Sequence, residues 1–189
     1  MSDDIRRMLQ ETVQVQQALF GQIDLIQQIA ATITSALRGG HKILLCGNGG
    51  SAADAQHVAA ELLGRFARER AAWPALALTT NSSVLTAVAN DYDFERVFAR
   101  QVEGLAVAGD VVVGISTSGT SPNVIRALET ARAKGCITIG FTGETGGQLQ
   151  DVSDLCFRAP STQTPHIQEA HIVVWHIVCE LVERDLTTS

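Results

Sequence analysis

The sequence predicts an α/β protein in which a mostly parallel sheet is covered by helices on both faces. Short apolar runs alternate with segments of helical periodicity, which is the pattern of β-α-β units. Turns rich in glycine or in hydroxyl side chains follow two of these runs, as is typical where parallel strands lead into ligand-binding helices. The 189 residues correspond to one ordinary α/β domain.

The first forty residues predict two helices that precede the sheet. We find no internal repeat, low-complexity tract or linker, so we expect a single domain. It divides into an N-terminal helical extension over residues 1–40, closed by Gly39-Gly40, and an α/β core over residues 41–189. The apolar positions that recur at helical spacing in the extension are Ile5, Met8, Leu9, Val13, Phe20, Ile26, Ile29, Ile33 and Leu37.

Short apolar runs in the core predict the strands. They are residues 42–46, 75–78, 111–115, 137–142 and 155–157. Helical segments lie between them, among them an alanine-rich stretch from residue 51 to about residue 66, and residues 123–134. A long final helix is predicted over roughly residues 165–184, with an apolar side formed by Ile167, Val174, Ile177, Val178 and Leu181.

Charge and cysteine content exclude several classes of protein. Fourteen Lys and Arg against 20 Asp and Glu give a net charge of −6, which disfavours binding to a nucleic-acid backbone. The four cysteines form no CxxC pair and indicate reduced core residues. The first residues form no apolar leader, and no run of about 18 apolar residues occurs, so we expect a cytoplasmic protein without a membrane span.

A glycine-rich turn follows the first predicted strand. Residues 47–52, GNGGSA, match the GxGxxG/A pattern, in which glycine lets a ligand approach the backbone at a helix N-terminus. A dinucleotide site is disfavoured because the second strand ends in Thr79-Thr80-Asn81 without an acidic residue, and no GK[ST] indicates a P-loop. A tight turn that needs only positive φ is the alternative to ligand binding.

A second loop, residues 116–121, is richer in hydrogen-bond donors. Five of its six residues, STSGTS, carry hydroxyl groups, and Pro122 can begin a helix. Such donors favour a phosphate monoester held without lysine or metal, although an ordinary capped turn uses the same residues. A third polar segment contains Asn81 and, further on, Asn90-Asp91. Because all three segments follow parallel strands, they can converge on one crevice.

His57 and Glu61 are four residues apart on the helix that follows the glycine turn. They lie about 40° apart around its axis, so one face presents both side chains to a metal or a substrate. A solvent-exposed i,i+4 pair explains the same spacing.

Four segments together resemble the sugar isomerase (SIS) domain family, in the same order and nearly from end to end. They are CGNGGSAADAQH (46–57), GISTSGTSPN (114–123), FTGETGG (141–147) and IQEAHIVVWH (167–176). The resemblance implies a three-layer fold similar to flavodoxin and Rossmann folds, with a five-stranded parallel sheet. It also implies a homotetramer with active sites where subunits meet.

Within this family the chain is similar to members that interconvert sedoheptulose 7-phosphate and D-glycero-D-manno-heptose 7-phosphate. This reaction is the first step of heptose precursor synthesis for lipopolysaccharide or another surface glycan. The resemblance implies one zinc ion per subunit, held by His57, Glu61, Gln168 and His176. It implies a sugar-phosphate site at Asn48, Gly49, Gly50, Asn90, Asp91, Ser116, Thr117, Ser118 and Ser121, to which we add Ser51, Glu61 and Gln168 as substrate contacts.

Gln168 and Glu169 compete for one position on the final helix. Around the helix axis Glu169 lies about 20° from His176 and Gln168 about 80° from it, so periodicity favours Glu169 whereas the resemblance favours Gln168. We follow the resemblance. His171 lies about 140° from His176, and we assign it to packing or to a subunit contact.

Aldose–ketose isomerisation needs a base at carbon and an acid at oxygen, because a proton moves between C1 and C2 through an enediol(ate). We predict that Glu61 moves the carbon-bound proton while His176 serves the oxygens or ring opening, with the reverse assignment open. The alternatives are a non-catalytic SIS tetramer that associates with the replication initiator, and an isomerase of another phosphosugar. The presence of both Glu61 and His176 favours an enzyme.

Overall fold

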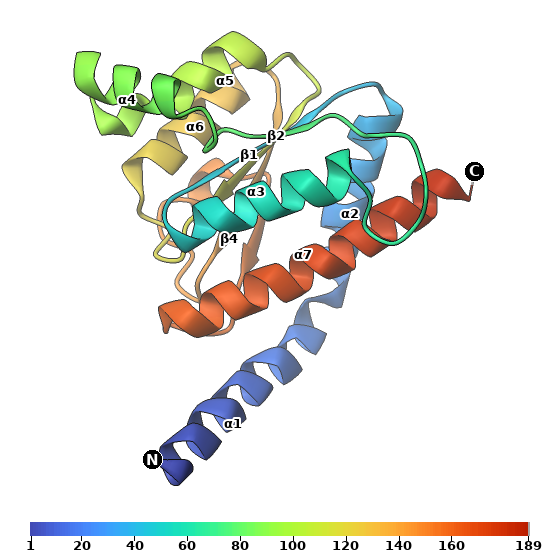
Figure 1. Ribbon diagram of the computed structural model, residues 1–189, viewed down its shortest axis with the longest axis vertical. Helices are drawn as coiled ribbons and strands as arrows, with labels where there is room; N and C mark the ends of the chain where they lie inside the picture. Colours follow the sequence, from blue (N-terminus) through green and yellow to red (C-terminus); the bar gives the residue numbers. More distant parts are fainter. Residues whose placement is uncertain (189) are drawn as a thin grey trace.

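The computed structural model describes residues 1–188, and in them five parallel strands form a sheet in the order β2-β1-β3-β4-β5 (Figure 1). Central strands β1 and β3 are buried along their whole length, because they have neighbours on both sides and helices on both faces. The predicted parallel α/β fold is confirmed. The strands are β1 (Ile43–Gly47), β2 (Ala75–Ala77), β3 (Val111–Ile115), β4 (Ile137–Thr142) and β5 (Leu155–Arg158).

Alternate residues of each strand supply two separate cores. In β1, Leu45 packs in the core that also contains buried side chains of α2 (Ile23–Arg38), α3 (Gly50–Leu63) and α7 (Thr164–Thr187). Leu44, one residue earlier, packs in the core on the other face. That face is covered by α4 (Ser82–Asp91), α5 (Ala99–Leu105) and α6 (Pro122–Ala133).

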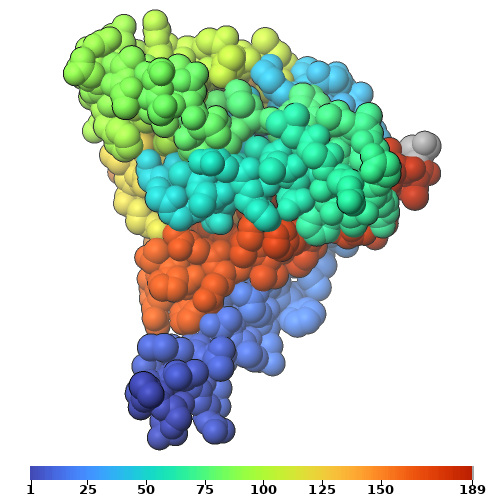
Figure 2. Space-filling model, in the orientation of Figure 1, coloured from blue at the N-terminus to red at the C-terminus, as the bar shows by residue number. Residues whose placement is uncertain are grey.

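The first helix, α1 (Ser2–Ala18), projects from the body of the molecule (Figures 1 and 2). None of its residues is buried, although its sequence is amphipathic. Ile5, Met8, Leu9 and Val13 are all more than half exposed. The helical spacing predicted for this segment is present, but in a single chain its apolar side has little to pack against.

Short 3₁₀ turns complete the chain at Leu19–Gln22, Phe94–Arg96 and Gln150–Val152.

Two helices differ in detail from the sequence prediction. The helix expected to reach about residue 66 ends at Leu63, because Gly64 and the following loop turn back toward α7. Ile177, expected on the buried side of the final helix, is 42% exposed. It lines an apolar groove between α7 and the α1–α2 segment, so the apolar arc of α7 is wider than one chain covers. No helix within residues 1–188 has the length and apolarity needed to cross a membrane.

The strand order reverses direction between β1 and β3, since β2 lies on one side of β1 and β3 on the other. In open parallel sheets, ligands bind in the crevice beyond the carboxyl ends of strands at such a switch point. The glycine turn follows β1 and the hydroxyl-rich loop follows β3. The topology therefore brings the two predicted ligand loops to this crevice.

Candidate active site

The turn after β1 takes a backbone conformation that only glycine adopts easily. Gly49 has φ +55° and ψ −122° and stands at the N-terminus of α3. Asn48 beside it forms a reciprocal amide pair with Asn123 of α6, with two N–H···O bonds of 2.9 Å. Asn123 is buried, so the pair ties the glycine turn to the first turn of α6.

The loop after β3, residues 116–121, is held by its own hydroxyl groups. The Ser116 and Ser121 hydroxyl oxygens are 2.8 Å apart, and Ser116 and Ser118 lie 3.4 Å apart. Ser118 accepts bonds from the backbone N–H and the hydroxyl of Thr120, at 3.2 and 2.9 Å. Gly119 has φ +68°, which closes the loop. We refer to residues 116–121 as the serine loop. It collects hydroxyl groups around the N-terminus of α6, as a phosphate site requires.

The serine loop rests on the segment that follows β4. Gly143 donates its N–H to Thr117 O at 3.0 Å, and Leu149 donates to Gly119 O at 2.9 Å. The end of β4 is held in turn by His171 of α7, whose Nε2 donates to Thr142 O at 3.0 Å. His171 is fully buried, and desolvation lowers the pKa of its imidazole to about 4, so the ring is neutral near pH 7.

His57, Glu61 and His176 form a cluster between α3 and α7. His57 Nε2 lies 3.2 Å from Glu61 Oε1 and 3.0 Å from His176 Nε2. One ligand atom from each of the three residues lies within 4.8 Å of the others. The ring of Phe66 lies 5.8 Å from that of His176. The i,i+4 spacing of His57 and Glu61 therefore places both on the face of α3 that meets α7.

Gln168 and Glu169 face different neighbours. Gln168 packs so closely against Gly50 that a Cβ at position 50 would overlap its side-chain amide. Glu169 instead accepts from Thr12 Oγ1 at 3.1 Å and lies 3.0 Å from His166 Nδ1, on the side of α1. Of the two residues, Gln168 is the one at the glycine turn, because its long side chain reaches across the start of α3.

The donor set of this region fits a zinc ion. Two imidazole nitrogens and one carboxylate oxygen are zinc ligands of the usual kind, whereas the side chain of Gln168 lies against Gly50 at the start of α3. Ligands about 2.0–2.1 Å from a tetrahedral zinc ion lie about 3.3 Å from one another. The observed separations of 3.0 and 3.2 Å are near that value.

The structure does not bring Asn90 and Asp91 to the cluster. Both lie at the C-terminal end of α4, where Asn90 Nδ2 donates to Asp91 Oδ1 at 2.9 Å, and both are exposed. Helix α4 covers the opposite face of the sheet from α3 and α7. Ser51 is buried in the first turn of α3, within the glycine turn.

Three residues that support the site were not identified from the sequence. Asn123 is the amide partner of Asn48. Its position at a helix start, directly after Ser121-Pro122, could have indicated from the sequence that it lies near the site. Glu183 and Arg70 form a buried ion pair of 3.1 Å beside the cluster. Glu183 is seven residues after His176, so it lies on the same face of α7, and this spacing could have been recognised in the sequence.

Comparison with known proteins first defines the class. The family model described as "SIS domain" matches residues 5–143, a range that includes the glycine turn, α3 and the serine loop. The chain belongs to the SIS domain family, and the resemblance noted in its sequence is confirmed.

Individual relatives narrow this class. Phosphoheptose isomerases from Geobacter sp. (strain M21) and Pelobacter propionicus are 53% and 54% identical over 98% of the chain, and the alignments cover 97% and 99% of those proteins. The structure of phosphoheptose isomerase from Neisseria gonorrhoeae matches with a TM-score of 0.92 and 40% identity, covering 97% of this chain and 98% of that one. The corresponding values for the protein from Francisella tularensis are 0.93, 36%, 96% and 97%. Within the SIS domain family, the chain groups with the phosphoheptose isomerases.

Proposed function

We propose that the protein interconverts sedoheptulose 7-phosphate and D-glycero-D-manno-heptose 7-phosphate. The observation that carries this proposal is the His57–Glu61–His176 cluster, which brings a carboxylate and an imidazole of α3, the helix that begins at the glycine turn, together with an imidazole of α7. His57 lies seven residues, or about 10 Å, along α3 from Gly50. An extended sugar phosphate can bridge such a separation, with its phosphate at the helix N-termini and its carbonyl end at the cluster.

In the proposed mechanism, the serine loop binds the phosphate and the cluster moves the protons. Glu61 takes the proton from C2 of the aldose, the electrons left on C2 form the enediolate, and Glu61 returns the proton to C1 to give the ketose. His176 supplies and removes the proton on the O1 and O2 oxygens and assists ring opening. No net proton is gained or lost, so each side chain returns to its starting state.

The proposed metal is one zinc ion per subunit, held by His57, Glu61 and His176, with Gln168, which contacts Gly50 in this chain, as the fourth ligand that the family resemblance implies. When bound, it supplies a Lewis acid that polarises the substrate carbonyl. Metal binding and proton transfer compete for His176, because an imidazole nitrogen engaged with a metal has no free lone pair. We therefore assign proton transfer at carbon to Glu61, whose carboxylate has a second oxygen.

The proposed assembly is a homotetramer, in the cytoplasm, with active sites where subunits meet. Its support is the uncovered apolar side of α1, together with the groove between α7 and the α1–α2 segment. The groove is lined by Val13, Phe20, Ile23, Val173, Ile177 and Leu181, among others. Subunit contacts of this kind would allow Asn90 and Asp91, which lie away from the cluster in one chain, to reach the site of a neighbour.

The testing experiment is an NMR assay of sedoheptulose 7-phosphate conversion by purified protein, with added zinc, with chelator, and with Glu61→Gln. We expect turnover by the wild type and a kcat at least about 100-fold lower in Glu61→Gln, which is the usual size of a general acid–base effect. Lower turnover with chelator supports the zinc assignment. A folded protein that converts no sugar phosphate would overturn the proposal and favour a scaffold, and conversion only of another sugar phosphate would correct the substrate.

A further inference from the structure

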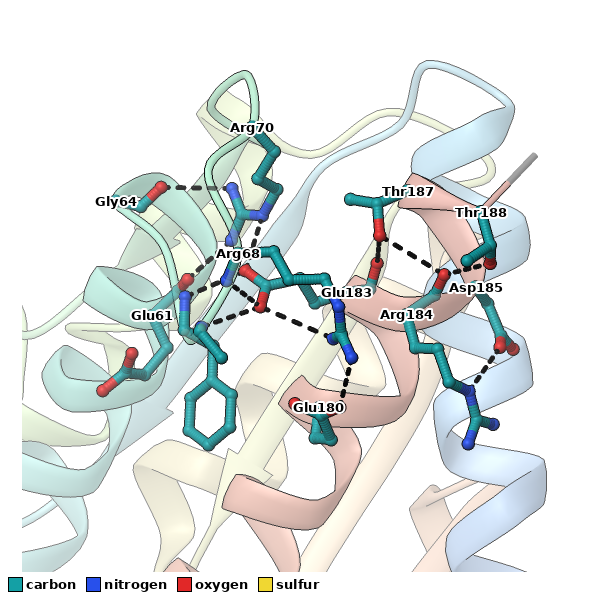
Figure 3. Close-up of polar contacts among 12 residues, drawn as sticks. Glu61, Gly64, Arg68, Arg70, Glu180, Glu183, Arg184, Asp185, Thr187 and Thr188 are labelled. Atoms are coloured by element: carbon teal, nitrogen blue, oxygen red, sulfur yellow. Dashed lines mark hydrogen bonds and ion pairs between the residues drawn. The ribbon is translucent and has the colours of Figure 1, made fainter.

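Glu183 of α7 is a buried carboxylate that binds the backbone of the loop after α3 (Figure 3). Its two oxygens accept the backbone N–H groups of Phe66, Ala67 and Arg68 at 3.0, 2.7 and 2.7 Å, and the Nε–H of Arg70 at 3.1 Å. Burial alone would raise the pKa of this carboxyl. The three backbone bonds and the Arg70 charge outweigh that effect and lower it, so Glu183 is ionised.

Arg70 extends this contact to the last turn of α3. Its guanidinium donates to Leu62 O at 2.9 Å, to Gly64 O at 3.1 Å and to the backbone oxygen of Glu61 at 2.8 Å. It also lies over the ring of Trp73, at 3.5 Å from the centroid. The carbonyls at a helix C-terminus lack intrahelical partners, and Arg70 satisfies them here. Figure 3 shows the Glu61 carbonyl turned toward Arg70 while the Glu61 carboxylate points the other way.

The same loop touches the imidazole of His176. Phe66, whose backbone N–H Glu183 accepts, places its ring 5.8 Å from that of His176 at an interplanar angle of 38°. His176 and Glu183 are seven residues apart and share one face of α7. One buried charge pair therefore connects the backbone of Glu61 on α3 with the ring that packs against His176 on α7.

We propose that Glu183 and Arg70 are positioning residues that set the orientation of Glu61 and His176 for the reaction. The proposal rests on the proposed isomerase function. Glu183 fixes Phe66 against His176, and Arg70 fixes the turn of α3 that carries Glu61. Neither residue touches the reacting atoms. Their loss leaves phosphate binding by the serine loop intact and misaligns the two side chains that transfer protons, and a misplacement of about 1 Å can cost about 100-fold in rate.

The test compares Glu183→Gln with a matched variant, Asp110→Asn. Asp110 is also a fully buried carboxylate; it accepts the N–H groups of Lys42 and Val107 at 3.0 and 2.8 Å and pairs with Lys42 Nζ at 2.6 Å. It precedes β3, and its partners Lys42 and Val107 belong neither to α3 and α7 nor to the loop that Glu183 binds. Both substitutions remove a buried charge of similar role, so both lower the melting temperature.

We expect Glu183→Gln, measured well below its melting temperature, to lower kcat by about 10- to 100-fold with KM changed by less than about twofold. Asp110→Asn should keep kcat within about twofold of the wild type. In protein labelled with ¹³C-histidine, Glu183→Gln should shift the His176 resonance and Asp110→Asn should not. Equal kcat values in the two variants, or a rise in KM without a fall in kcat, would overturn the positioning role.

Phe66→Leu tests the contact if Glu183→Gln does not fold. It keeps every hydrogen bond of Glu183, because residue 66 donates to Glu183 through its backbone N–H, and removes only the aromatic ring. We expect a lower kcat and a shifted His176 resonance with a smaller loss of melting temperature; an unchanged resonance would contradict the proposal. The histidine spectrum also separates the two hypotheses. If the wild type converts no heptose phosphate, the function fails, while the shift of His176 still decides the positioning role.

Discussion

The serine loop and the cluster between α3 and α7 are built in opposite ways. The hydroxyl groups of the serine loop bond to residues at most five positions apart, such as Ser116 to Ser121, and the backbone of the loop is supported by bonds from Gly143 and Leu149. The cluster joins side chains 119 positions apart, His57 and His176, and the helices that carry them are connected by the buried Glu183–Arg70 pair. The phosphate end of the site therefore depends on local backbone conformation, whereas the chemical end depends on the packing of two helices.

This difference predicts which substitutions affect binding and which affect turnover. A change within the serine loop alters the donors that hold the phosphate, so it acts on KM and on kcat/KM. A change in the packing of α3 on α7 alters the alignment of Glu61 and His176, so it acts on kcat. The two regions meet at His171, which belongs to α7 but supports the end of β4 under the serine loop.

The largest effect is expected from Gly119→Ala. A Cβ at this position would overlap the backbone oxygen of Gly146, and the φ of +68° disfavours any side chain. Gly146 cannot move away without breaking the contact of the loop with residues 143–149. We expect kcat/KM to fall at least about 100-fold, equivalent to about 2.7 kcal/mol. Steady-state kinetics with sedoheptulose 7-phosphate measures this.

Gly104→Ala is the control for Gly119→Ala. Gly104 lies on α5 with open space around its Cβ position, so alanine there favours the helix and should leave the kinetics unchanged. Normal kinetics in Gly119→Ala would show that the serine loop can rearrange, and would remove the distinction between a rigid local loop and a packed helix pair.

The strands and the loops that follow them were predicted well from the sequence, because each is determined by residues that are consecutive in the chain. The strand at 111–115 and the hydroxyl run after it can be read directly, and the structure places them as expected. Residue types and spacing could not bring His176 to His57, because that contact depends on how α7 packs on α3; only the family resemblance joined them. Periodicity favoured Glu169 over Gln168 because a helical wheel shows where a side chain starts and not how far it reaches.

The next largest effect is a loss of stability at acid pH that is caused by the buried imidazole of His171. The pKa of the folded imidazole is about 4, against 6.5 for an exposed one. Below pH 6.5 the unfolded chain binds a proton that the folded protein does not, so the stability contributed by neutral His171 is complete above pH 6.5 and is lost as pH falls toward 4. Among the described residues its Nδ1 has no hydrogen-bond partner that could stabilise the added proton. We expect a loss of about 2 kcal/mol between pH 7.5 and pH 5.

His171→Gln isolates this contribution, because its amide can donate to Thr142 O but does not titrate. Urea unfolding of both proteins in chelator, at pH 7.5 and pH 5, should show a smaller loss of unfolding free energy in the variant. Equal losses of unfolding free energy in the two proteins would mean that protonation of His171 does not destabilise the folded state. The contact between His171 and the end of β4 would then be less rigid than the burial of His171 indicates.

The smallest effect is expected from Ser116→Ala, which removes a single hydroxyl from the serine loop. Ser116 is buried and bonded to Ser121, so the loop keeps its backbone bonds while the phosphate loses one donor. A hydrogen bond to a charged group contributes at least about 1.5 kcal/mol and the other hydroxyl groups of the loop remain, so KM should rise about 10-fold while kcat changes little. Thr130→Ala, whose hydroxyl donates to Arg126 O on the exposed side of α6, is the matched control. A fall in kcat at constant KM would mean that the serine loop takes part in the chemical step. It would contradict the assignment of phosphate binding to the serine loop and of turnover to the cluster between α3 and α7.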